Sequence, residues 1–214
     1  MPKGIDISEF QGDINIKNLD PDFVIIRYGD GGYEDIRCQQ NINKCIEAGI
    51  PYGLYWLIRS WTMADAEYHA SDICKFADKQ KVPPAIGIWC DVEDEYDNDP
   101  EDAIPFVETF CATVEDCGYY TGIYCNQWYH DNLYPDLGRF DCWIAEWDED
   151  PHEDPGYGTM KQYSTAGNLD RDVSFVPLST YDIRSGKPDP EPLTLDDRVS
   201  IIERKIEEIE RKLK

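Results

Sequence analysis

Residues 85–93 read AIGIWCDVE, an apolar run that ends in two carboxylates one residue apart, Asp91 and Glu93. The run is too apolar for the edge of a sheet, so we expect a buried strand with both faces covered. Successive side chains of a strand point to opposite faces, and Asp91 and Glu93 therefore point the same way. Burying a carboxylate costs roughly several kcal/mol unless its charge is matched or used. Because a glycosidase needs two carboxyl groups that face one bond, this pair is the first candidate for chemistry.

Similar apolar runs recur along the chain, and helical patterns separate them. The strands that we expect span residues 4–8, 23–29, 53–58, 85–92, 119–125, 142–146, 160–163 and 171–176. The helices that we expect span residues 35–48, 62–79 and 101–117, and beyond Asn126 the helices shorten. This order predicts an α/β fold, a TIM-like (β/α) barrel of about eight parallel strands with helices depleted in the last third. A doubly wound sheet is the alternative, but the sequence has no G-x-G-x-x-G or G-K-[ST] phosphate loop.

The charge of the chain excludes one large class of partners. The net charge is −24, and residues 184–214 carry eight basic and eight acidic side chains, so the first 183 residues hold the entire excess. A body this acidic repels the phosphates of DNA and RNA, so we expect no nucleic acid partner. We also expect no membrane span and no signal peptide. The eight cysteines include no C-x-x-C pair, and we expect them to be reduced.

The end of the chain has a different character. We divide the sequence into a barrel domain over residues 1–183, a proline-rich linker over 184–194 and a coiled-coil helix over 195–214. Basic residues at the g positions of the heptads and acidic residues at the e positions favour parallel pairing, and isoleucine at a and d favours three strands. We therefore expect a parallel homo-oligomer, a trimer or a dimer. The alternative is an amphipathic helix that folds back on the barrel. The apolar heptad positions are Leu195, Val199, Ile202, Ile206, Ile209 and Leu213.

Polar side chains lie at or near the ends of several expected strands, where a parallel barrel gathers its chemistry. The acids among them are Asp6, Asp91, Glu93, Glu146 and Asp172, and the other polar groups include Tyr55, Tyr124 and Gln162. Other chemistries are not favoured. The three histidines are isolated and form no H-E-x-x-H motif, so we expect no metal and no cofactor. No G-x-S-x-G elbow supports a serine hydrolase.

Six short motifs, taken in order, make the sequence similar to family 25 of the glycoside hydrolases, the lysozyme-type N-acetylmuramidases. The resemblance covers roughly residues 3–178. Each motif alone is weak, but their order and spacing are specific. The matching segments are GIDIS at 4–8 with FQG at 10–12, PYGLY at 51–55, DVE at 91–93, GIY at 122–124, WIA at 143–145 and QYS at 162–164.

The resemblance implies hydrolysis of the β-1,4 bond between N-acetylmuramic acid and N-acetylglucosamine in bacterial peptidoglycan. It makes Glu93 the general acid, whose pKa its neighbours Asp91 and Asp6 would raise. Asp91 would stabilise the anomeric centre or orient the acetamido group of the substrate, so a covalent and a substrate-assisted mechanism both stay open. Asp6 and Asp172 resemble further active-site acids of the family. The residues expected to contact the substrate are Tyr55, Tyr124, Trp143, Gln162 and Tyr28.

Two other functions fit parts of the sequence. The barrel could bind glycans without turnover, or it could belong to a virion or assembly component that the coiled coil organises. The intact D-x-E motif at residues 91–93 favours an enzyme. A wall hydrolase without a visible signal peptide indicates a phage lysin, made in the host cytoplasm and acting on the cell wall after release.

Overall fold

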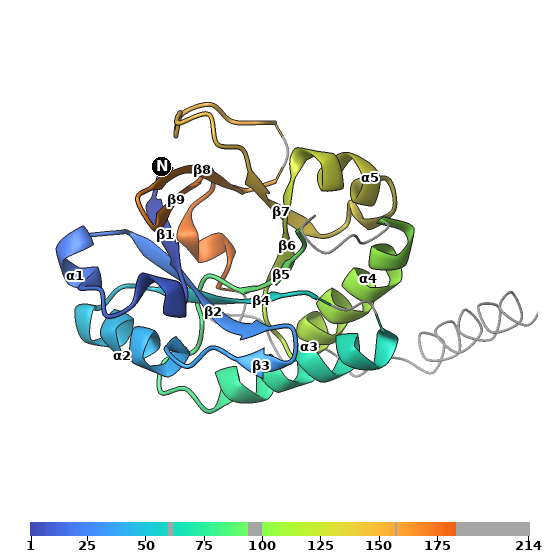
Figure 1. The fold of residues 1–214 in the computed structure, drawn as a ribbon, viewed down its shortest axis with the longest axis horizontal. Helices are drawn as coiled ribbons and strands as arrows, with labels where there is room; N and C mark the ends of the chain where they lie inside the picture. The colour runs from blue at the N-terminus through green and yellow to red at the C-terminus, as the bar shows by residue number, and fades with distance from the viewer. Residues whose placement is uncertain (60–61, 94–99, 157, 183–214) are drawn as a thin grey trace, which may run out of the picture.

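The computed structural model describes residues 1–59, 62–93, 100–156 and 158–182, which form a closed β-barrel with helices outside it (Figure 1). The strands are β1 (Lys3–Ile7), β2 (Phe23–Asp30), β3 (Tyr33–Glu34), β4 (Tyr52–Leu57), β5 (Ile88–Asp91), β6 (Thr121–Asn126), β7 (Asp141–Ala145), β8 (Met160–Ala166) and β9 (Leu169–Ser174). The order around the barrel is β1, β2, β4, β5, β6, β7, β8 and β9, and pairing of β9 with β1 closes it. β3 lies outside the barrel and pairs with β2 alone. All eight expected strands are therefore present, with ends shifted by a few residues.

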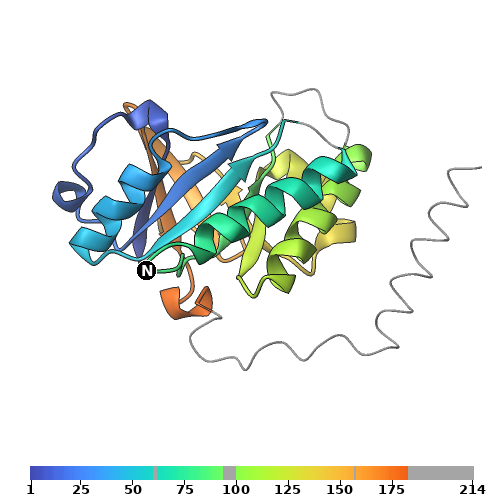
Figure 2. The ribbon, with the colours of Figure 1, turned by 90° about the horizontal axis from the view of Figure 1, so that it is seen from below.

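Helices cover only part of the barrel's circumference. They are α1 (Ile16–Leu19), α2 (Cys38–Ala48), α3 (Met63–Asp78), α4 (Pro100–Asp116) and α5 (Gln127–Leu137). α2 and α3 contact β2, whereas α4 and α5 contact β5, β6 and β7. Figure 2 shows α3 and α4 side by side on the outer face. In the described residues after α5, only the single turn η3 (Leu178–Thr180) is helical, which confirms the expected loss of helices in the last third.

β9 runs antiparallel to both of its neighbours, while all other neighbouring barrel strands are parallel. The expectation of a purely parallel barrel is therefore wrong at this strand. The reason is local: only Gly167 and Asn168 join β8 to β9, and the φ of Gly167 is 74°. A two-residue turn makes a hairpin, because a parallel pair needs a long crossover connection. The start of β9 consequently lies at the carboxyl ends of the parallel strands, where Asp170 pairs with Asp6.

Large side chains fill the barrel interior below and beside the carboxyl ends of the strands. Gly4 and Gly122 leave the space for them: a Cβ on Gly4 would overlap the ring of Phe23, and one on Gly122 would lie 2.6 Å from the ring of Trp89. Tyr181 packs edge-on against Trp89 and closes this end of the barrel. The cluster consists of Phe23, Ile25, Tyr55, Leu57, Ile86, Trp89, Tyr124, Trp143, Met160 and Tyr181.

The outward faces of the strands form a second apolar layer with the helices. All eight cysteines are free thiols, and all except Cys117 are buried. Within the described part of the chain, no helix combines the length and the apolar character that crossing a membrane requires. The linker at 184–194 and the heptads at 195–214 lie outside the described residues, so the domain division and the coiled coil stay predictions.

Candidate active site

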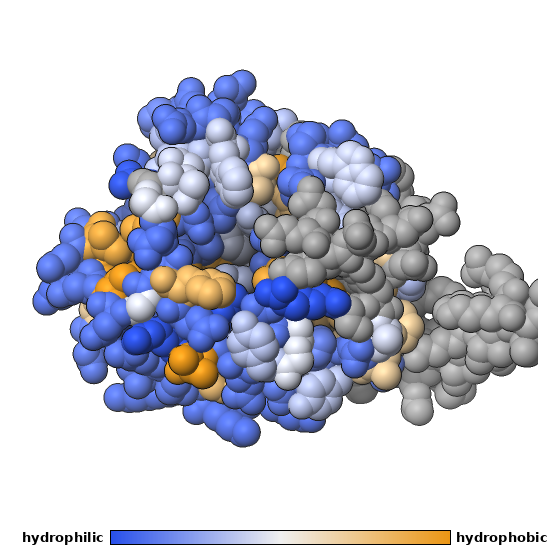
Figure 3. All heavy atoms as spheres, in the orientation of Figure 1, coloured by the Kyte–Doolittle hydropathy of each residue, from blue (hydrophilic) through white to orange (hydrophobic). Residues whose placement is uncertain are grey.

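A cavity of about 430 Å³ opens at the carboxyl ends of the parallel strands. Figure 3 shows this face of the molecule, which is mostly hydrophilic. Of the nine predicted site residues, all except Asp172 and Tyr28 line the cavity. The lining consists of Asp6, Ser8, Phe10, Gln11, Arg27, Tyr55, Leu57, Arg59, Asp91, Glu93, Tyr124, Trp143, Trp147, Gln162, Thr165 and Asp170.

Three carboxyl groups from opposite sides of the barrel meet in this cavity. Asp6 lies in β1, Asp91 ends β5, and Glu93 follows Asp91 on the same side of the chain. Burial raises the pKa of Asp91 well above its usual value, and the nearby charges of Glu93 and Asp6 raise it further. Burial likewise raises the pKa of Asp6 to about 8, with smaller contributions from the charges of Asp170 and Glu93. The cavity therefore cannot hold all of its carboxyl groups in the charged form at once.

Asp172 lies behind the cavity lining, in β9, where its backbone pairs with Gly4 of β1 and Gln162 of β8. The indole Nε1–H of Trp143 donates to its Oδ1 atom at 2.9 Å. Its Oδ2 atom is buried and accepts no hydrogen bond from the described residues. Burial, followed by the charge of Asp6, raises the pKa of Asp172 well above its usual value. Burial and the mutual charge of Asp6 and Asp172 thus both favour a protonated carboxyl at this point of the site.

A side-chain amide connects Asp6 to two aromatic residues. The Nε2 atom of Gln162 donates to Oδ2 of Asp6 at 2.9 Å. The Oε1 atom of the same amide accepts from the hydroxyl of Tyr124 at 2.9 Å and from the indole of Trp147 at 2.6 Å. A carbonyl oxygen has two lone pairs, so this oxygen has no capacity left for a further donor. These bonds fix the orientation of the Gln162 amide.

Tyr55, Tyr124 and Trp143 form one wall of the cavity. The ring of Trp143 lies 4.5 Å from that of Tyr124 and 6.2 Å from that of Tyr55, measured between centroids. Burial raises the pKa of Tyr55, and the charges of Asp6 and Asp91 raise it further, so its hydroxyl stays protonated and can donate. The wall presents both ring surfaces and hydroxyl donors, the combination that suits sugars.

Tyr28 does not belong to this site, and its assignment as a substrate contact is wrong. Its hydroxyl donates to Asp72 at 2.8 Å, and its ring stacks on Phe76 at 4.4 Å, both in α3. The period of two along β2 explains the error: Arg27 points into the cavity, so Tyr28 points outward to the helices.

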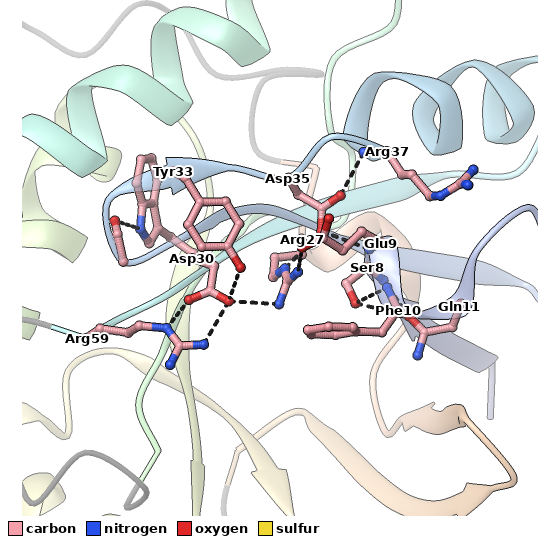
Figure 4. A network of polar contacts seen from close by, with 12 residues as sticks. Ser8, Glu9, Phe10, Gln11, Arg27, Asp30, Tyr33, Asp35, Arg37 and Arg59 are labelled. Carbon is pink, nitrogen blue, oxygen red and sulfur yellow. Dashed lines mark hydrogen bonds and ion pairs between the residues drawn. The ribbon is translucent and has the colours of Figure 1, made fainter.

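An ion-pair network, which the sequence reading missed, borders the cavity (Figure 4). The guanidinium of Arg27 is buried and donates to Asp35 at 2.9 Å, to Asp30 at 3.0 Å and to Glu9 at 3.1 Å. Arg59 donates to Asp30 as well. Burial alone would raise the pKa of Asp30, but hydrogen bonds from Arg59 and Tyr33 and the charge of Arg27 lower it overall. The signal was available, because a lone arginine inside the apolar run FVIIRYG requires buried partners.

Two exposed aromatic residues on the cavity rim were also not predicted from the sequence. Phe10 lies in the turn η1 (Glu9–Gln11), with the guanidinium of Arg27 4.8 Å from the centre of its ring. Trp147 follows β7 by two residues. No local pattern distinguishes either residue from an ordinary surface aromatic.

The carboxyl groups of the cavity place a protonated group close to a charged one. A carboxyl group that carries a proton can donate it to a leaving oxygen, while a neighbouring carboxylate stabilises positive charge on carbon. Within residues 1–59, 62–93, 100–156 and 158–182, no group of three or more His, Cys, Asp or Glu side chains has the arrangement of a metal site. Such an arrangement can perform acid-assisted cleavage of a glycosidic bond.

Comparison with known proteins gives the same chemical class. A family model described as glycosyl hydrolases family 25 matches residues 5–171. No curated protein sequence matches the chain. Among solved structures, the modular autolysin LytC from Streptococcus pneumoniae is similar with 26% identity and a TM-score of 0.68, over 80% of this chain and 46% of that chain. The chain thus corresponds to less than half the length of that autolysin.

Two further structures share the fold at lower identity. A muramidase from Trichobolus zukalii has 20% identity and a TM-score of 0.69, over 87% of this chain and 100% of that chain. The catalytic domain of endolysin ply40 from bacteriophage P40 of Listeria monocytogenes has 20% identity and a TM-score of 0.67, over 84% of this chain and 96% of that chain.

Proposed function

The chain belongs to glycosyl hydrolase family 25, and from this membership we propose that it is a muramidase that cleaves bacterial peptidoglycan. The bond is the β-1,4 linkage between N-acetylmuramic acid and N-acetylglucosamine. The observation that carries the proposal is the convergence of Asp6, Asp91 and Glu93 on one cavity beside an aromatic wall. The similar autolysin LytC has been solved in complex with a synthetic peptidoglycan ligand, which supports the same substrate class.

In the proposed mechanism Glu93 is the general acid that protonates the leaving oxygen. Its partly exposed position on the cavity lining gives it access to a bound glycan and to solvent protons. The charge of Glu93 is one cause of the raised pKa of Asp91, so a protonated Glu93 makes an ionised Asp91 easier to maintain. The nearby cation of Arg27 acts in the same direction, because it lowers the pKa of Asp91. The proposed mechanism requires the proton on Glu93 and the charge on Asp91, and both of these neighbours favour an ionised Asp91 against the burial that raises its pKa.

Asp91 then faces the positive charge that develops at the anomeric carbon. Asp91 lines the cavity, and its Oδ1 atom accepts no hydrogen bond from the described residues. It either stabilises the anomeric centre directly or orients the acetamido group as an internal nucleophile. Asp6, which accepts a hydrogen bond from Gln162, positions the sugar or the attacking water.

Replacing Glu93 with glutamine tests the proposal. The variant keeps the size of the side chain but has no proton to give, and we expect the lysis of purified cell walls to fall by about 10²-fold or more. Glu47→Gln is the matched control, because Glu47 is exposed on α2, away from the cavity lining. Mass spectrometry of the digest identifies the newly exposed sugar end. A Glu93→Gln variant that clears walls at the wild-type rate would refute the role of Glu93 as the general acid. New reducing ends on N-acetylglucosamine would show that a different glycosidic bond is cleaved.

The setting that we propose is phage-encoded lysis: the enzyme is made in the host cytoplasm and reaches the wall after the membrane is breached. Its fold is shared with the catalytic domain of a bacteriophage endolysin. Expression in a bacterial host should leave cells intact until the inner membrane is permeabilised. Lysis on expression alone would contradict this setting.

We further propose that residues 195–214 join the chains into a parallel homo-oligomer. The support is the heptad pattern alone, because these residues lie outside the described part of the chain. Several linked cavities would bind a polymeric wall more tightly than one cavity does, without any new contact.

A further inference from the structure

We propose that Trp147 is a glycan-binding residue, a rigid platform on the cavity rim on which a sugar ring of the substrate packs. This inference rests on the proposed function and adds a binding residue to it. Trp147 lines the cavity, yet 64% of its surface is exposed. An indole offers an apolar face and a hydrogen-bonding edge, which matches the apolar face and the hydroxyl rim of a pyranose.

The ring of Trp147 is held by its edge. Its Nε1–H group donates to Oε1 of Gln162 at 2.6 Å. The amide of Gln162 is in turn fixed by the hydroxyl of Tyr124 and by Oδ2 of Asp6. The indole is therefore connected through one side chain to an acid of the proposed catalytic site. Because the polar edge is the anchored part, the exposed surface is mainly the apolar ring.

The backbone on both sides of Trp147 is held as well. Lys161 in β8 is 0% exposed, and its ammonium group lies 3.3 Å from the carboxylate of Glu146 and 2.7 Å from that of Asp148. The backbone N–H of Glu146 also donates to the carbonyl of Gln162 at 3.0 Å. A buried lysine is costly unless its charge is matched, so this ion-pair clamp is a specific arrangement.

These two anchors mean that little order has to be gained when a ligand arrives. Immobilising a mobile side chain on binding costs free energy, and here the fold has fixed the indole beforehand. Exposure, position on the cavity and double anchoring together distinguish Trp147 from an ordinary surface aromatic.

Trp128 provides a matched control within the same chain. It is 53% exposed, so it resembles Trp147 in solvent contact. It lies in α5, packs edge-on against Tyr129, and does not line the cavity. If exposure alone made a tryptophan bind glycans, the two residues would behave alike.

The test measures glycan binding apart from turnover. Binding of a purified tetrasaccharide of alternating N-acetylglucosamine and N-acetylmuramic acid is titrated by calorimetry in the full-length Glu93→Gln protein. Adding Trp147→Ala should weaken the Kd by about tenfold or more, the scale of a buried aromatic contact. Trp147→Phe, which keeps a ring but loses the bond to Gln162, should give a smaller loss, and Trp128→Ala should give none.

Two further measurements separate binding from folding and from chemistry. In the ¹⁵N-labelled Glu93→Gln protein, the indole N–H signal that disappears in Trp147→Phe should shift on titration, while that of Trp128 should not. In the active enzyme, Trp147→Ala should raise KM more than it lowers kcat and leave the pH profile unchanged, because Gln162 keeps its bonds to Tyr124 and Asp6. A fall in kcat at constant KM would overturn the proposal.

The outcomes separate the two proposals. If Trp147→Ala binds the tetrasaccharide as tightly as Trp128→Ala does, the platform role is refuted while the muramidase proposal stands. If the Glu93→Gln parent and the active enzyme both fail to bind any wall glycan, the proposed function is refuted and the platform role falls with it.

Discussion

Replacing Arg27 with methionine would remove the central cation of the network that borders the cavity while keeping most of the side-chain volume. Arg27 makes three ion pairs, at 2.9, 3.0 and 3.1 Å, and two of its partners, Asp30 and Asp35, are fully buried as side chains. Breaking a buried pair by removing one partner costs about 3–5 kcal/mol, because an uncompensated charge is left behind.

The contacts that Asp30 and Asp35 keep without Arg27 determine where in that range the loss of stability falls. Asp30 keeps hydrogen bonds from Arg59 and Tyr33. Asp35 keeps the backbone N–H groups of Glu9 at 2.9 Å and Arg37 at 2.8 Å. We therefore expect the free energy of unfolding at pH 7 to fall by about 3 kcal/mol, the lower end of the range.

The same variant carries a pH signature. The pKa of Asp30 is lowered in the wild-type fold, so its charge contributes stability above the unfolded pKa, near 4, and the contribution is lost as the pH falls through the folded value. Without Arg27 the pKa of Asp30 rises and the carboxyl takes up a proton at a higher pH. The stability difference between wild type and variant should therefore narrow as the pH falls from 7 to about 4, the unfolded pKa of the carboxyl.

Urea unfolding at both pH values, followed by circular dichroism, measures these differences. Arg27→Lys is the control, because it keeps the positive charge but not the three-way geometry, and we expect an intermediate loss. A loss below about 1 kcal/mol at pH 7, typical of a surface pair, would refute the view of a buried network. So would a difference that stays constant between the two pH values.

Three further predictions concern the interior, the site and the end of the chain. Gly4→Ala should destabilise the barrel by about 1–3 kcal/mol through overpacking, whereas Gly32→Ala, which has no atom within 4 Å of its Cβ, should change urea stability little. Gln162→Met should raise the pKa of Asp6 above about 8, because a hydrogen bond that lowers it is lost; an unmoved carboxyl ¹³C titration would contradict this. Deleting residues 195–214 should convert an oligomer to a monomer by light scattering and weaken wall binding; an unchanged mass would contradict the coil.

The strands of the barrel could be predicted from sequence because their signal is local. Runs such as residues 23–29 and 53–58 are apolar at successive positions, as strands covered on both faces must be. The direction of β9 was not predicted, because it depends on the two-residue turn at Gly167 and Asn168 and not on the strand itself. The short α5 was missed as well, since its sequence lacks a clear apolar stripe.

The acids of the site were predictable because a strand end fixes where a side chain lies. Seven of the predicted site residues line the cavity, and their positions could be predicted from that rule together with the order of the motifs. Tyr28 failed for the opposite reason: a shift of one residue along a strand moves a side chain to the other face. The sequence indicates that Arg27 needs buried partners but not which ones, and it gives no signal for Trp147, because partners such as Glu9 and Gln162 are distant in sequence.

The pairing of β9 with β1 has a consequence for how the enzyme is made. Lys3 pairs with Val173 and Asp6 with Asp170, so the seam joins the two extremes of the barrel sequence. Contacts of such long range form late in folding, since the entropy of closing the loop must first be overcome. A chain still emerging from the ribosome lacks this seam, and with it one side of the acidic cavity. Catalytic competence should therefore appear only once translation has passed β9, which leaves no partly active intermediate during synthesis.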